Sequence, residues 1–192
     1  KGSPIFLLIG IFTVLYLSET YKTGFAKNFV GHYPNRTPVI VAQFLTAWFY
    51  TVIMLLLSVV TYTILFLIWR SDGAGFGAFG EGLAGFGVLS LGYGALIGLI
   101  FLIYYLSRSQ AVTMTFTVLY GLDIIAELIS YLEMGIKKAF DLDIPITDQL
   151  LSIQFNALDF GAWDRKFLIY MPIMILLNIA LSALLFQRSD VD

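Results

Sequence analysis

Long apolar runs separated by short polar stretches dominate the sequence. A helix crosses a bilayer when about 20 mainly apolar residues follow one another, with a range of roughly 17–25. The pattern predicts five such spans, at about residues 3–18, 39–69, 83–106, 111–132 and 167–186. We therefore predict an all-α integral membrane protein of the cell membrane. It is a polytopic helical bundle that forms a single transmembrane domain over residues 1–192.

Composition supports this prediction. The chain is 59% hydrophobic and only 12% charged, whereas soluble domains carry about 25% charged residues. So little charge leaves too little polar surface to cover a water-soluble globule, and the apolar excess requires membrane lipid as its partner. A net charge of −2 gives no general attraction to nucleic acid. The lack of cysteine excludes disulfides and thiolate metal sites within this stretch.

Three connecting or packing features stand out. Residues 71–87 alternate glycine with phenylalanine and read as a flexible loop that leads into the third span. Gly94 and Gly98 form a GxxxG pattern within that span, which favours close helix packing. Residues 134–166 are polar but punctuated by apolar residues, so we expect a structured external loop with short helices at the membrane surface.

The segment between the first two spans has helical periodicity. Its aromatic residues recur at every fourth position, at Tyr21, Phe25 and Phe29. This spacing predicts a short amphipathic helix over residues 20–30, capped by Ser18 or Thr20. An aromatic stripe of this kind lies on lipid headgroups or docks into a groove on a partner, and the pattern alone does not separate the two.

Asp123 and Glu127 are the acidic residues of the fourth span. They are four residues apart and so lie on one face of a continuous helix. A carboxylate at the membrane centre costs at least about 2.5–3.5 kcal/mol, so such residues usually face a bundle interior or a watery cavity. They are candidates for a substrate pathway or a buried polar contact. The alternative is that the helix is short and Glu127 already sits near the interface.

Catalysis has no support in the sequence. The single histidine, His32, lies among prolines in a short loop and reads as a surface residue. No zinc-protease, nucleophile-elbow or phosphate-loop motif is present, so we expect no catalytic, cofactor-binding or metal-binding residues. If ATP hydrolysis drives this protein, another chain supplies it.

Short motifs in the loop between the first two spans and in the tail resemble those of permease subunits of the type-2 (export) class of ABC transporters. The tail motif is Phe186-Gln187-Arg188-Ser189-Asp190-Val191. The loop motif consists of Glu19, Tyr21, Lys22, Thr23, Gly24, Pro34 and Arg36. In that family the segment after the span is a cytoplasmic coupling helix that contacts the ATP-binding subunit. The resemblance therefore implies that the partner-binding residues here are Glu19, Tyr21, Lys22, Gly24, Phe25, Lys27, Phe29 and Arg36.

The resemblance also implies the assembly. The chain would pair with a second permease subunit, identical or paralogous, and with two ATP-binding subunits that bind ATP and magnesium. Family members typically have six spans, so a first span would precede Lys1. Lys and Arg divide almost evenly between the two sides and do not orient the bundle. The resemblance places the loop 19–38 and the tail in the cytoplasm. The expected substrate of such an exporter is an amphipathic peptide or a lipid-like molecule.

Other functions stay open at this point. One is a proton-coupled secondary transporter that uses Asp123 and Glu127 and needs no ATPase. Another is a non-transporting membrane scaffold or immunity protein, for which the two carboxylates are hard to explain. An intramembrane enzyme is disfavoured because no metal or nucleophile constellation is present.

Overall fold

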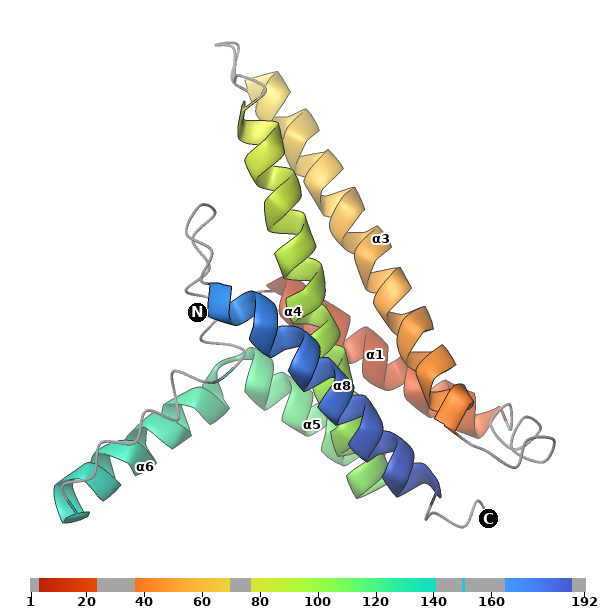
Figure 1. The fold of residues 1–192 in the computed structure, drawn as a ribbon, viewed down its shortest axis with the longest axis vertical. Coiled ribbons are helices and arrows are strands. Elements are labelled where there is room, and N and C mark those ends of the chain that lie inside the picture. Colours follow the sequence, from red (N-terminus) through yellow and green to blue (C-terminus); the bar gives the residue numbers. More distant parts are fainter. Residues whose placement is uncertain (1–3, 24–36, 70–76, 141–149, 151–164, 188–192) are drawn as a thin grey trace.

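The computed structural model describes residues 4–23, 37–69, 77–140, 150 and 165–187 (Figure 1). Within these ranges the chain forms helices and no strand: α1 Pro4–Lys22, α3 Thr37–Trp69, α4 Gly77–Ser107, α5 Gln110–Gly121, α6 Ile124–Phe140 and α8 Arg165–Gln187. Four of these helices are long and apolar enough to cross a membrane, and five if α5 and α6 are counted as one bent span. Helices suit this role because they satisfy every backbone polar group without water. The predicted all-helical fold is therefore confirmed for the described residues, and its long apolar helices are those expected of a membrane protein.

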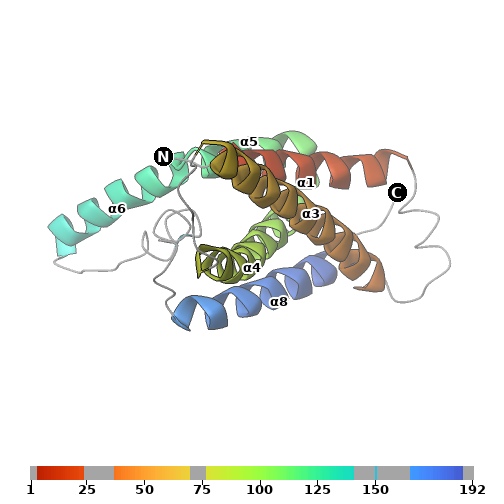
Figure 2. The same ribbon diagram turned by 90° about the horizontal axis from the view of Figure 1, so that it is seen from above.

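Helix α4 is the centre of the bundle. It packs against α8, α3, α1 and α5, and its residues Ile97, Ile100 and Phe101 are completely buried. Seen from above, α4 lies between α8 on one side and α1 and α5 on the other (Figure 2). The outer surface of the bundle is also apolar, because large hydrophobic side chains of α3 and α8, such as Phe49 and Leu176, are exposed.

Cross-helix contacts fix the direction of each helix. Phe6 and Tyr21 of α1 contact Tyr93 and Tyr104 of α4, in the same order, so α1 and α4 run parallel. Helix α8 runs the same way, and α3 and α5 run against them (Figure 1). The bundle therefore has two ends. We call the end at which α1, α4 and α8 finish the C face. At the other end the helices begin at different levels, because Phe6, near the start of α1, contacts Tyr93, 16 residues into α4. We call the level at which α1 begins the N face.

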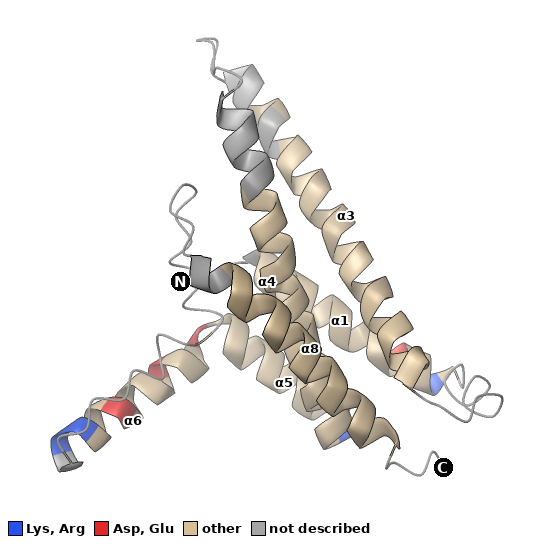
Figure 3. Ribbon diagram, viewed as in Figure 1, with Lys and Arg blue, Asp and Glu red and all other residues tan. Residues whose placement is uncertain are grey.

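The described charged residues lie near helix ends and along α6, and the rest of the bundle is apolar (Figure 3). Glu19 and Lys22 are in the last turn of α1 and Arg108 follows the end of α4, at the C face. Asp123 directly precedes α6, and Glu127, Glu133, Lys137 and Lys138 belong to α6. This separation is what two water-facing surfaces around a hydrocarbon layer require.

Hydroxyl groups enter the apolar body at little cost because their own helices satisfy them. Thr13 Oγ1 donates to the carbonyl of Ile9 at 2.8 Å, and Thr51 and Thr117 make the same bond four residues back. All three side chains are buried. Threonine and serine therefore let helices approach closely without leaving an unpaired donor in the bilayer.

Several predicted boundaries are corrected. The fourth span is not one helix over 111–132, because the chain breaks at Leu122 and Asp123 and α5 and α6 differ in direction by 70°. Helix α6 continues to Phe140, so the first residues of the expected loop 134–166, for which short helices were predicted, continue a helix that begins at Ile124. Helix α4 begins at Gly77, so 11 of the 17 residues of the predicted glycine-rich loop 71–87 belong to it. Residues 71–76 of that loop, and residues 141–149 and 151–164 of the other, lie outside the described residues.

Candidate functional site

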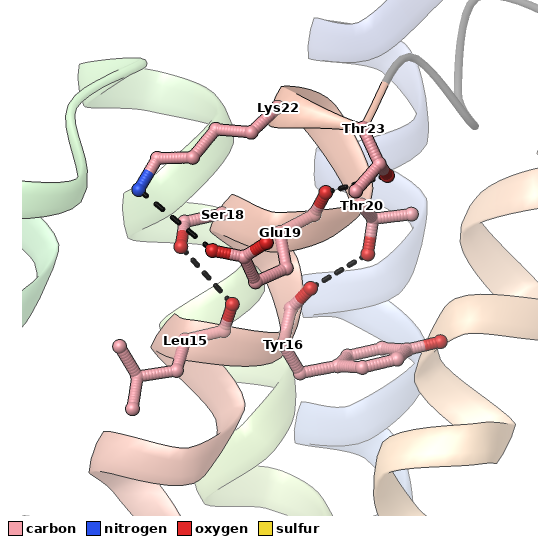
Figure 4. A network of polar contacts seen from close by, with 7 residues as sticks. All are labelled: Leu15, Tyr16, Ser18, Glu19, Thr20, Lys22 and Thr23. Carbon is pink, nitrogen blue, oxygen red and sulfur yellow. Dashed lines mark hydrogen bonds and ion pairs between the residues drawn. The ribbon is translucent and has the colours of Figure 1, made fainter.

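The end of α1 marks the start of the predicted coupling segment, and its polar side chains are bonded within the helix (Figure 4). Ser18 Oγ donates to the carbonyl of Leu15 at 3.0 Å, and Thr20 Oγ1 donates to that of Tyr16 at 2.6 Å. Neither hydroxyl caps a new helix, and α1 continues to Lys22. The expectation that a separate helix starts at Thr20 is therefore wrong at its first residues, since residues 20–22 are the last turn of α1.

The tip of α1 presents a pair of exposed charges. Lys22 Nζ lies 3.9 Å from Glu19 Oε1, and the two side chains are 61% and 65% exposed. Such a pair contributes little to stability because water and salt screen it. Both groups are accessible to a partner at the C face. Of the other expected partner-binding residues, Gly24, Phe25, Lys27, Phe29 and Arg36 lie outside the described residues.

Tyr21 lies inside the bundle, where it joins an aromatic cluster of Tyr21, Tyr104, Tyr105 and Phe186. Its ring centroid is 5.6 Å from that of Tyr104, 6.1 Å from that of Tyr105 and 6.2 Å from that of Phe186. Tyr105 and Phe186 are 5.4 Å apart. Tilted and edge-on ring pairs at these distances are attractive beyond their burial of area. The cluster connects the last turn of α1 to α4 and to the end of α8.

A buried hydrogen bond adds α3 to this cluster. Tyr105 Oη donates to Gln43 Oε1 at 2.8 Å, and Gln43 is only 4% exposed. Nearby, Gln187 Nε2 donates to Thr37 Oγ1 at 2.8 Å, which joins the end of α8 to the start of α3. Four helix ends are thereby fixed to one another at the C face. Residues 24–36 connect two of these ends, those of α1 and α3, along the chain.

Asp123 and Glu127 lie at the break between α5 and α6. Asp123 has a backbone φ of 61°, a conformation that asparagine and aspartate adopt more readily than most residues. Its carbonyl accepts the amide hydrogen of Glu127 at 3.0 Å, which starts α6. Asp123 is half-buried and Glu127 is exposed. Because Asp123 precedes α6, the premise that both carboxylates lie on one face of a continuous helix is wrong.

The same break lies at the N face, level with the start of α1. A Cβ atom at Gly121 would meet Phe6 and Leu7 in the first turns of α1, and one at Gly10 would meet Thr117. Asp123 is therefore level with the beginning of α1.

Gly94 and Gly98 lie where α4 approaches its neighbours most closely. A Cβ at Gly98 would be 3.2 Å from Asn178 Cβ of α8, and one at Gly94 would be 3.1 Å from Ile175 Cδ1 and 3.2 Å from Trp48 Nε1. Trp48 Nε1 donates to the carbonyl of Ser90 at 2.9 Å. The two glycines therefore allow α8 on one side and α3 on the other to approach the central helix.

Sequence reasoning missed two buried amides, Gln43 and Asn178. They are 4% and 2% exposed, and within the described part of the chain Gln43 Nε2 and Asn178 Nδ2 have no hydrogen-bond acceptor. The signal was present, since each is an isolated amide within an otherwise apolar run. The described residues contain no group of three metal-ligating side chains that could hold an ion.

No family model, curated protein or solved structure matches this chain.

Proposed function

We propose that the chain is the permease subunit of an ATP-driven ABC exporter. It would form the translocation pathway with a second permease subunit and be driven by two ATP-binding subunits. The observation that carries the proposal is the aromatic cluster at the C face. The cluster includes Tyr21, in the last turn before residues 24–36, together with residues of two other helices.

The mechanism follows from that linkage. An ATP-binding subunit that closes on ATP would displace the segment 19–36, beginning at the exposed pair Glu19 and Lys22. Closely packed interiors transmit displacement because they have few alternative arrangements. The rings of Tyr21, Tyr104 and Phe186 would pass the movement to α4 and α8, the most extensively packed helix pair. The expected cargo is an amphipathic peptide or a lipid-like molecule.

The position of the carboxylates gives the proton-coupled alternative no support. A proton relay needs titratable groups within the membrane or lining a watery cavity. Asp123 and Glu127 both lie at the N face, at a helix break level with the start of α1. We therefore propose that Asp123 forms the break between α5 and α6 and does not transfer protons.

Photo-crosslinking in native membranes tests the proposal. A crosslinking amino acid at Lys22, exposed at the C face, should form an adduct with an ATP-binding subunit. The matched control is Leu122, which is 49% exposed at the opposite end of the bundle, and it should form none. No adduct with an ATPase from position 22, or equal adducts from both positions, would contradict the proposal.

A further inference from the structure

Helix α6 differs from the other described helices in how its side chains are distributed. Most of its large aliphatic residues recur at helical spacing and form one stripe, which consists of Ile125, Leu128, Ile129, Leu132 and Ile136, whereas Tyr131 and Met134 lie on the other side. Its polar and charged residues occupy the opposite side: Glu127, Ser130, Glu133, Lys137 and Lys138. The separation is typical of a helix at a boundary between an apolar and an aqueous phase.

The bundle leaves most of the apolar stripe uncovered. Ile125, at the root of α6, packs against the core. Further along, Leu128 and Leu132 are 58% and 65% exposed. Among the described helices, α6 packs mainly against α5, and it points away from the bundle in both views (Figures 1 and 2). An apolar stripe of this length requires a partner outside the described bundle.

The start of α6 is level with the start of α1, and α6 leaves the bundle in a new direction. The contacts of Gly121 with Phe6 and Leu7 put the start of α6 level with the start of α1, whose residues 5–22 are a candidate span. From there α6 leaves at 70° to α5. A continuation across the bilayer would run nearly along α5, whereas this direction runs close to the membrane plane.

We propose that α6 lies in the plane of the membrane at the N face, with its apolar stripe in the lipid and its charged side in water. It is then not the second half of a bent span. A spanning α6 would take Glu127, Glu133 and two lysines into or through the hydrocarbon, at about 2.5–3.5 kcal/mol for each charge at the centre. An in-plane α6 exposes all of them to water.

The length of α5 agrees with this arrangement. Its 12 residues extend about 18 Å, which is about 12 Å short of a typical hydrocarbon core of about 30 Å. In-plane amphipathic helices sit about 5–10 Å inside the boundary. If α6 lies at this depth, it accounts for most of the missing distance of about 12 Å, and the short helix α5 then reaches across the rest of the hydrocarbon core.

Charge favours lipid as the occupant over a second copy of the chain. Lys137 and Lys138 are exposed and lie in the last turn of α6, where they suit both the helix dipole and anionic headgroups. This inference is independent of the proposed exporter function.

Site-directed spin labelling in phosphatidylcholine–phosphatidylglycerol nanodiscs tests the orientation. These 192 residues contain no cysteine, so a spin label attaches only to the cysteine that is introduced into them. Leu128→Cys, Leu132→Cys and Ile136→Cys probe the stripe, and Ser130→Cys is the matched control on the charged side. We expect stripe labels that are accessible to oxygen, shielded from a water-soluble nickel complex and equal in depth, with the control accessible to nickel.

Three other outcomes overturn the proposal. A spanning helix would place the labels at 128 and 136 about 12 Å apart in depth, from about 1.5 Å per residue. A helix that projects into water would make all four labels accessible to nickel. A second copy on the stripe would shield the stripe labels from both reagents and broaden their spectra by spin–spin coupling. Because Leu128 and Leu132 are exposed, labels there leave the bundle folded, and gel filtration checks this.

Discussion

The hydrogen bond between Tyr105 and Gln43 allows the packing of the C face to be tested by removing a single oxygen atom. Tyr105→Phe removes the hydroxyl that donates to Gln43 Oε1 at 2.8 Å. The ring remains, so its contacts with Tyr21 and Phe186 persist. The buried oxygen of Gln43 then lacks this donor.

Two ranges bracket the expected cost. An unpaired buried acceptor costs about 1–3 kcal/mol in soluble proteins. Hydrogen bonds between membrane helices average about 0.6 kcal/mol, with a maximum of about 1.7, because the unfolded helices also find partners in the bilayer. We therefore expect Tyr105→Phe to lower the free energy of unfolding by about 1 kcal/mol.

The double variant should behave differently. Gln43 Nε2 has no acceptor within the described residues, so Gln43 already holds one unpaired buried group. Combining Gln43→Leu with Tyr105→Phe removes both bonding partners together with that amide. Replacing both members of a buried pair by apolar groups is close to neutral or stabilising. We expect the double variant to match or exceed the wild-type stability.

Unfolding by sodium dodecyl sulfate in mixed micelles, followed by circular dichroism, measures all four proteins of this cycle. Tyr131→Phe is the matched control, because Tyr131 is 68% exposed on α6 and its hydroxyl contributes nothing to the core. The reasoning predicts a coupling energy of about 1 kcal/mol between positions 43 and 105. Additive effects, or a Tyr105→Phe variant as stable as the control, would refute it.

Three further substitutions test other parts of the account. Gly98→Leu should destabilise the protein much more than Gly98→Ala, because the added side chain meets Asn178 Cβ at the closest approach of α4 and α8; thermal unfolding in detergent compares them. Asp123→Asn and Asp123→Gly should keep the free energy of unfolding of the wild type, whereas Asp123→Val should lower it by about 1–2 kcal/mol, because the backbone φ at this position is 61°. Equal losses of stability in all three variants would instead assign the effect to the carboxylate. Phe25→Ala should leave the protein inserted in the membrane but weaken recovery of the ATP-binding subunit in a pull-down, and full recovery would contradict the predicted coupling stripe.

The spans were predictable because lipid selects for a simple property, a long apolar run. The second predicted span, 39–69, differs from α3 by two residues at its start. The break at Asp123 was not predictable in this way, because hydropathy averages over many residues while a bend needs one unusual φ angle. Gly121 and Asp123 on either side of an apolar leucine were the local signal for it.

The contacts of the candidate site could not be predicted from the sequence. Tyr21 fits an aromatic stripe at every fourth position, and that pattern predicted an outward anchor. In the structure its ring packs against Tyr104 and Phe186, which are 83 and 165 residues away along the chain. Helical spacing gives the face of a residue on its own helix but does not give the helix that covers that face.

We propose that this chain works with an ATP-binding partner. Native mass spectrometry of the tagged protein, extracted gently from its own membranes, tests it most directly. The account predicts a complex with two permease chains and two ATP-binding chains, which dissociates into a permease pair when Phe25 is replaced by alanine. Recovery of the wild-type chain alone, or with partners that lack ATPase activity, would contradict the account.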